Sequence, residues 1–185
     1  MHGPGDLNTQ TYPTNLDWAP SWPGGRIVEV VDTLALTLRP LRRAVWRKAR
    51  DKALRLWEPA GMIFRLSERD ASAWEFPGFT GLKVGESESC LLPGKLRIAR
   101  STYNAPADTY YPISWAWWTA ERQGACVFFK PNKHFWQGYW FGQLVANVCH
   151  ELGHCLGLSH GGGGVMSGAL RPNEHDLDSV RRYYS

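Results

Sequence analysis

Three histidines and a glutamate occur within residues 150–160, at a spacing that is typical of a metal-binding site. Residues four apart lie on one face of a helix, so His150 and His154 can present two ring nitrogens to one metal ion about 2.0–2.1 Å away. Gly157 follows three residues later, and glycine tolerates the positive φ that ends a helix abruptly. The chain can then turn and bring His160 to the same ion. The spacing therefore predicts a three-histidine metal site.

Three protein ligands leave the fourth tetrahedral position to water, which is typical of a catalytic zinc site. Glu151 lies beside the first ligand, where its carboxylate can reach that water without binding the metal. Zinc lowers the pKa of the water towards 7, and Glu151 can accept its proton. Scattered histidines that share a helix by chance are the alternative, but the added Gly157 and His160 make the pattern far more restrictive. We expect one zinc ion as the cofactor.

The pattern His150-Glu151-x-x-His154-x-x-Gly157-x-x-His160, with a methionine downstream at Met166, resembles the metzincin zinc proteases. The sequence of the motif, HELGHCLGLSH, looks most like that of the matrixins. The resemblance implies that Met166 forms a hydrophobic floor under the histidines and is not a ligand. It also implies an α+β, metzincin-like zincin fold, with a twisted, mostly parallel sheet and three main helices.

The periodicity of apolar residues along the chain agrees with such a fold. A β-branched run predicts a first strand, and a 3.6-residue apolar period predicts a long first helix. Strands are expected at 26–32, 62–66, 95–99, 114–118 and 125–130, and helices at 40–57, 139–157 and from Asn173 to Tyr184. The apolar stripe of the first helix is expected to comprise Leu41, Val45, Trp46, Ala49, Ala53, Leu56 and Trp57.

Residues 26–185 are expected to form one catalytic domain, preceded by an extended, proline-rich arm at residues 1–25. Trp18 and Trp22 are candidates for holding the arm in place. An aspartate latch through Asp6 or Asp17 would make the arm a pro-segment; a solvated arm is the simpler interpretation. No apolar run predicts a transmembrane segment, and the arm lacks the pattern of a signal peptide. Export by another route, an intracellular role and a virus-associated role all stay open.

The positive charge of the chain is concentrated in Arg39–Arg55, on and beside the first helix. A basic helix face can hold an anionic surface such as nucleic acid, a cell-wall polymer or lipid headgroups. A solvated outer face is the alternative. The cations expected opposite the apolar stripe are Arg43, Arg47, Lys48, Arg50 and Arg55.

The four cysteines do not suggest a further metal site. Cys149 and Cys155 are six residues apart on the expected zinc helix, so their side chains point about 120° apart and cannot bridge each other. We interpret both as small core residues. Cys90 and Cys126 are free thiols or, in an exported protein, a disulfide. No histidine lies between His2 and His134 to form the second zinc site of matrixins, and calcium is possible without a supporting motif.

Two short segments separate this chain from the familiar matrixins. Only Gly161–Val165 lies between His160 and Met166, and only Ser167–Pro172 separates Met166 from the last helix. In the family this second segment walls the pocket for the residue after the scissile bond. The short segment therefore predicts a shallow or open pocket.

These features together predict a monomeric zinc endopeptidase that acts on a protein or peptide. A second hypothesis is an amide hydrolase of peptidoglycan cross-bridges, suggested by the basic helix and the ten tryptophans. A third is a zinc-stabilised binding or virion protein with little turnover. Glu151 argues against the third, because a purely structural site has no use for an uncoordinated carboxylate.

Overall fold

Five strands of the chain form one sheet in the computed structural model, which describes residues 22, 24–69, 95–100, 113–118, 124–130 and 140–185. The strands are β1 (Ile27–Asp32), β2 (Ile63–Ser67), β3 (Lys95–Arg100), β4 (Ile113–Trp118) and β5 (Gly124–Lys130). The helices are α1 (Leu34–Thr37), α2 (Pro40–Arg55), α3 (Phe141–Cys155) and α4 (Glu174–Tyr183), with short 3-10 turns η3 (Glu58–Ala60) and η7 (Val165–Ser167).

The sheet has the order β2-β1-β3-β5-β4, and every neighbouring pair is parallel except β4 with β5. Glu29 of β1 lies opposite Lys95 of β3, and their side chains form an ion pair at 3.4 Å. The expectation of an α+β protein is confirmed at this level, with a mostly parallel sheet.

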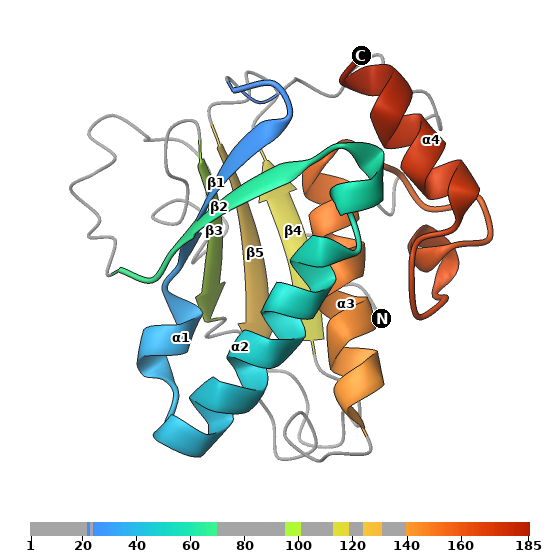
Figure 1. Ribbon diagram of the computed structural model, residues 1–185. Helices are drawn as coiled ribbons and strands as arrows, with labels where there is room; N and C mark the ends of the chain where they lie inside the picture. Colours follow the sequence, from blue (N-terminus) through green and yellow to red (C-terminus); the bar gives the residue numbers. More distant parts are fainter. Residues whose placement is uncertain (1–21, 23, 70–94, 101–112, 119–123, 131–139) are drawn as a thin grey trace.

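Helices α2 and α3 lie side by side over one face of the sheet (Figure 1). Their inner faces and the sheet enclose the main core, which contains Val30 of β1, Ile98 of β3 and Phe129 of β5 with no exposed surface. Trp46 of α2 packs edge-on against Phe129, with ring centroids 5.1 Å apart. Each fully buried aliphatic side chain of this kind stabilises the fold by about 1.5–3 kcal/mol, so this interface fixes where α3 lies.

The expected strands and long helices all occur, with ends that differ by at most two residues. Pro40 is the first helical residue of α2, and Gly61, at a φ of 84°, follows η3 where the sequence predicted a stop. The short helix α1 was not predicted. Its signal is Asp32, whose carboxylate accepts the Ala35 backbone N–H at 2.9 Å and so starts the turn.

Two assignments on the first helix are wrong. Leu41, expected in the apolar stripe, is 85% exposed, because it lies on the same outer face of α2 as the exposed Lys48, two turns further along the helix. Arg50, expected on the solvated face, is 3% exposed. Of the other six members of the stripe, four are buried in the core, and Val45 and Leu56 are partly buried and pack against it. Periodicity alone did not anticipate an ion-pair network around Arg50.

That network joins α2 to the ends of two strands. The Arg50 guanidinium donates to Asp32 at 2.5 Å, to Glu68 at 2.7 Å and to Asp51. Asp32 is fully buried and also accepts the Trp46 indole N–H at 2.7 Å. Arg47 pairs with Glu68 as well. Burial of the Arg50 charge is tolerated because three carboxylates surround it, and these carboxylates neutralise part of the basic segment.

Glu68 gives the network a measurable pH dependence. Hydrogen bonds from Arg47, and then from Arg50, lower the pKa of Glu68 from 4.5 to about 2. A carboxyl with a depressed pKa contributes stability that is present above pH 4.5 and is lost as the pH falls towards 2. We expect Glu68→Gln to lower the free energy of unfolding by about 1 kcal/mol at neutral pH, since Arg47 is half-exposed and the pair is screened. Urea unfolding at a series of pH values checks this.

The difference between the wild type and Glu68→Gln should shrink as the pH is lowered through that window. Loss of a metal in acid affects both proteins and cancels in the difference. A difference that stayed constant down to pH 2 would contradict the assignment of Glu68 as an ionised partner.

Several predictions fall on residues that the structure does not describe. Trp22 is described and buried, whereas Trp18, the remainder of the arm up to 21 and Cys90 lie outside the described residues. Cys126 and the tryptophans of β4 have a described backbone only. Among the described residues, the helices are too short or too polar to cross a membrane.

Candidate metal centre

Helix α3 places the first two histidines one turn apart. Its inner face is apolar and buried, with Leu144, Val148 and Leu152 against the core. His150 and His154 follow at the C-terminal end of this helix, with ring centroids 4.7 Å apart. Their Nε2 atoms are 3.1 Å apart. The spacing of four residues therefore produces the convergence that the sequence predicted.

The end of α3 turns the chain so that His160 joins them. Gly157 has a φ of 99°, and its N–H donates to the His154 carbonyl, while the Leu158 N–H donates to the Gly153 carbonyl at 3.0 Å. This pair of bonds is the Schellman motif, which requires the left-handed conformation that glycine adopts freely. His160 then lies with its Nε2 3.2 Å from that of His150 and 3.1 Å from that of His154.

The triangle of Nε2 atoms has the dimensions of a zinc site. Tetrahedral zinc with Zn–N distances of 2.0–2.1 Å separates its nitrogen ligands by about 3.3–3.4 Å, close to the 3.1–3.2 Å found. Among the described residues, His150, His154 and His160 are the group of side chains arranged to hold a metal ion.

In His150 and His154, a hydrogen bond at Nδ1 determines that Nε2 is the nitrogen that faces the other histidines. His150 Nδ1 lies 2.9 Å from the Val165 carbonyl oxygen, and His154 Nδ1 lies 2.8 Å from that of Leu158. A carbonyl only accepts, so each Nδ1 carries the hydrogen and each neutral ring has a lone pair on Nε2. Lone pairs that converge at 3.1 Å repel unless a cation lies between them. The donor set therefore fits a metal ion, and the carbonyls orient the ligands as metal-bound histidines require.

Glu151 is buried beside this centre. Its side chain belongs to the same turn of α3 as His150 and is 3% exposed. Glu151 is not a member of the histidine group. The structure thus shows a shielded carboxylate adjacent to His150 in the chain, and its role as a base stays a prediction.

Met166 packs against α3 at Gly153, between His150 and His154. Met166 lies in η7 and is 2% exposed. A Cβ on Gly153 would lie 2.4 Å from the Met166 sulfur and 3.0 Å from Cζ2 of Trp57, so only glycine allows this approach. The methionine is therefore buried under the helix turn that carries both ligands.

Asp176, which the sequence predicted only as part of a helix cap, also holds the turn η7 in place. Asp176 is 2% exposed and accepts the Val165 N–H at 2.8 Å, while Val165 accepts from His150. Asp176 also completes a capping box with Asn173 at the start of α4, as its spacing predicted. The capping motif was visible in the sequence, but its link to a metal ligand was not.

We expect Asp176→Ala to destabilise the protein by about 2–3 kcal/mol, because it removes a cap and leaves the buried Val165 N–H without an acceptor. Zinc affinity should fall about tenfold, since Val165 orients His150. Asp178→Ala, on the same helix but 42% exposed, is the matched control and should change stability by less than about 1 kcal/mol. Urea unfolding and zinc titration measure both effects. Unchanged zinc affinity in Asp176→Ala would contradict the proposed link from Asp176 through Val165 to His150.

The neighbouring cysteines are core residues, as expected. Cys149 and Cys155 are buried and not in a disulfide. Burial raises the pKa of both thiols, with a smaller contribution from the charge of Asp176 at Cys149 and of Glu151 at Cys155. Both therefore stay protonated and pack as small apolar side chains. His175, expected on the helix surface, is exposed on α4.

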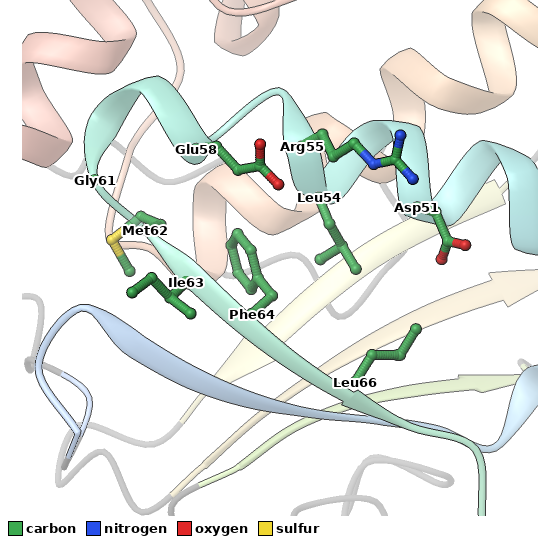
Figure 2. A pocket seen from close by; sticks show the side chains of 9 residues that line it. All are labelled: Asp51, Leu54, Arg55, Glu58, Gly61, Met62, Ile63, Phe64 and Leu66. Atoms are coloured by element: carbon green, nitrogen blue, oxygen red, sulfur yellow. The ribbon is translucent and has the colours of Figure 1, made fainter.

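A separate hollow of about 570 Å³ lies between the C-terminal half of α2 and the edge strand β2 (Figure 2). Leu54, Met62, Phe64 and their neighbours supply an apolar lining, with charged side chains from α2 and η3 at one side. None of its nine lining residues belongs to the metal centre. The hollow presents no cluster of catalytic or metal-binding groups.

Comparisons with known proteins give no family for the chain. No protein-family model matches it. No curated protein matches it either. A solved structure described as the GM1-bound form of the ECX AB5 holotoxin aligns over 85% of this chain and 69% of that chain, with 12% identity and a TM-score of 0.40. A likeness this weak supports no functional argument, so the chain's own residues must carry the proposal.

Proposed function

We propose that the chain is a zinc-dependent endopeptidase of the metzincin type, with a matrixin-like site. The observation that carries the proposal is the convergence of three histidine Nε2 atoms within 3.1–3.2 Å, with a buried glutamate beside them. Three nitrogen ligands leave a position open, which distinguishes catalytic from structural zinc sites.

His150, His154 and His160 would hold the ion. Zinc bound there supplies Lewis-acid polarisation of the scissile carbonyl and lowers the pKa of a coordinated water. Glu151 accepts a proton from the attacking water and later donates it to the leaving amine nitrogen. Its burial helps, because a shielded carboxylate interacts more strongly with a nearby proton donor than a solvated one does.

The surroundings of the ligands support a preorganised site. Carbonyl oxygens of Val165 and Leu158 fix two imidazole rings, and Asp176 fixes Val165 in turn. Preorganisation matters because small displacements of catalytic groups reduce rate strongly. Met166 contributes packing under the helix and no ligand atom.

The segment after Met166 favours an open pocket on the substrate's side. Ser167, Gly168, Ala169 and Leu170 are all exposed, and Leu170 shows 60% of its surface. A wall built from so short a segment encloses little volume. We therefore propose a broad preference at the residue after the scissile bond, and the preferences of matrixins are not carried over.

Incubation with unfolded casein tests the proposal. We expect cleavage that stops with a zinc chelator and returns when zinc is added in excess. Cleavage that persisted at full rate in the chelator would exclude zinc-dependent hydrolysis by this site.

A peptidoglycan cross-bridge amide hydrolase is the second candidate, favoured by the exposed cations Lys48, Lys52 and Arg55 on α2. Purified cell wall assayed beside casein separates the two: release of amino groups from cell wall alone favours this candidate. Zinc binding without cleavage of either substrate would instead support a zinc-stabilised binding or virion protein. The buried Glu151 beside the ligands argues against that last outcome.

A further inference from the structure

The solvent side of α2 carries a continuous ridge that is apolar at its N-terminal end and positively charged along the remainder. Leu41, Ala44, Lys48, Lys52 and Arg55 are exposed and follow one another at intervals of three, four, four and three residues. Such intervals keep side chains on one face of a helix. We call these five residues the outer ridge. It lies opposite the buried Trp46, Ala49 and Ala53, which face the core.

The cations of the ridge are not neutralised by the acids close to the helix. Glu68 forms ion pairs with Arg47 and Arg50, and Asp51 with Arg50. Glu58 lines the same hollow as Arg55 but is not within ion-pair distance of it. In the part of the chain that the structure describes, Lys48, Lys52 and Arg55 form no ion pair. The ridge therefore presents a net positive potential to solvent.

Two exposed leucines stand at the N-terminal end of the ridge. Leu41 is 85% exposed, and Leu36 at the end of α1 is 41% exposed. The Arg43 guanidinium donates to the carbonyls of Leu36 and Leu38, at 3.4 and 2.9 Å, so it ties α1 to the first turn of α2. Both leucines thus belong to one fixed corner, with Arg39 beside them.

We propose that the outer ridge, together with Leu36, docks the protein on an anionic lipid bilayer. Lysine and arginine side chains bind anionic headgroups, and exposed leucines enter the boundary with the acyl chains. A nucleic acid would bind the cations, but it has no apolar interior in which the Leu41 side chain could be buried. The pairing of leucines with unneutralised cations therefore favours a bilayer.

The outer ridge runs along the length of α2. Helix α2 lies lengthwise over the sheet beside α3, and its inner face contacts the core (Figure 1). The outer ridge is on the face of α2 opposite to these core contacts. Sixteen helical residues span about 24 Å, long enough for several headgroup contacts along one helix.

Vesicle flotation of the full, zinc-loaded chain tests the proposal. We expect binding to phosphatidylcholine vesicles that contain phosphatidylglycerol, and little binding to pure phosphatidylcholine. The triple change Lys48→Gln, Lys52→Gln and Arg55→Gln should weaken binding about a hundredfold, at about fivefold per charge. Leu41→Ser should weaken it about tenfold. The double change Arg171→Gln and Arg182→Gln removes two exposed cations elsewhere and should leave binding intact.

Heparin and duplex DNA distinguish a general polyanion site. The proposal expects Leu41→Ser to bind both polyanions as the wild type does, because only the bilayer uses the leucine. Equal vesicle binding by the wild type and Leu41→Ser would overturn the proposal, as would equal binding to neutral and anionic vesicles. All of these proteins keep the metal centre, so the results are independent of the proposed peptidase activity.

Discussion

Glu151→Ala should keep its zinc and lose cleavage of unfolded casein by about 10²–10⁴-fold, the usual contribution of a positioned general base. The side chain is buried beside His150 but lies outside the group of three histidines, so its removal leaves the ligand set complete. Zinc per chain and the initial rate of cleavage, measured on the same sample, check both halves of this result.

Two further variants show that the effect is specific. Glu151→Gln keeps the shape of the side chain but cannot accept a proton, and we expect it to be as inactive as Glu151→Ala. Glu174→Ala removes an exposed carboxylate on α4 and should be fully active. Full activity in either Glu151 variant would refute its role as the base, whatever the zinc content.

His154→Ala should abolish tight zinc binding. The ring is 1% exposed, its Nδ1–H is fixed by the Leu158 carbonyl, and its Nε2 lies 3.1 Å from both partners. Two remaining imidazoles form an incomplete site, so zinc per chain should fall from about one to near zero after dialysis against a weak chelator. Cleavage should disappear with the metal.

The same variant should also lose stabilisation by zinc. A ligand that binds only the folded state at a thousandfold excess over its Kd stabilises that state by about 4 kcal/mol. Added zinc should therefore raise the Tm of the wild type but not that of His154→Ala. His175→Ala is the matched control, because this exposed histidine on α4 lies outside the ligand group. Zinc-dependent stabilisation of His154→Ala equal to the wild type would contradict the ligand assignment.

The convergence of the three histidines was predictable because its determinants are local. His150 and His154 need only a helix, and His160 needs only the turn that Gly157 makes possible. These relations are contained in eleven consecutive residues. The capping box of Asn173 and Asp176 was predictable for the same reason.

Long-range partners explain what the sequence did not reveal. Arg50 is buried because Asp32 and Glu68, at the ends of two different strands, meet it in the folded chain. Asp176 braces Val165 only because α4 packs back against the end of α3. Helical periodicity contains no information about such neighbours. The apolar stripe also included Leu41, although this residue lies on the outer face of α2 and is 85% exposed.

Gly153, within the histidine motif itself, also has a role that depends on long-range packing. The pattern requires no particular residue between Glu151 and His154, yet a Cβ at Gly153 would collide with Met166 and press on Trp57. Trp57 follows α2, and its indole N–H donates to the Cys149 carbonyl at 3.1 Å. The glycine is explained by packing between three separate segments, which the sequence does not display.

We propose that a single zinc ion held by His150, His154 and His160 makes this chain a peptidase. Stepwise return of zinc to the metal-free protein, with casein cleavage measured at each addition, tests it most directly. We expect the rate to rise in proportion to added zinc and to reach its plateau at about one zinc per chain. A chain that binds one zinc through these histidines and still cleaves no peptide bond would contradict it.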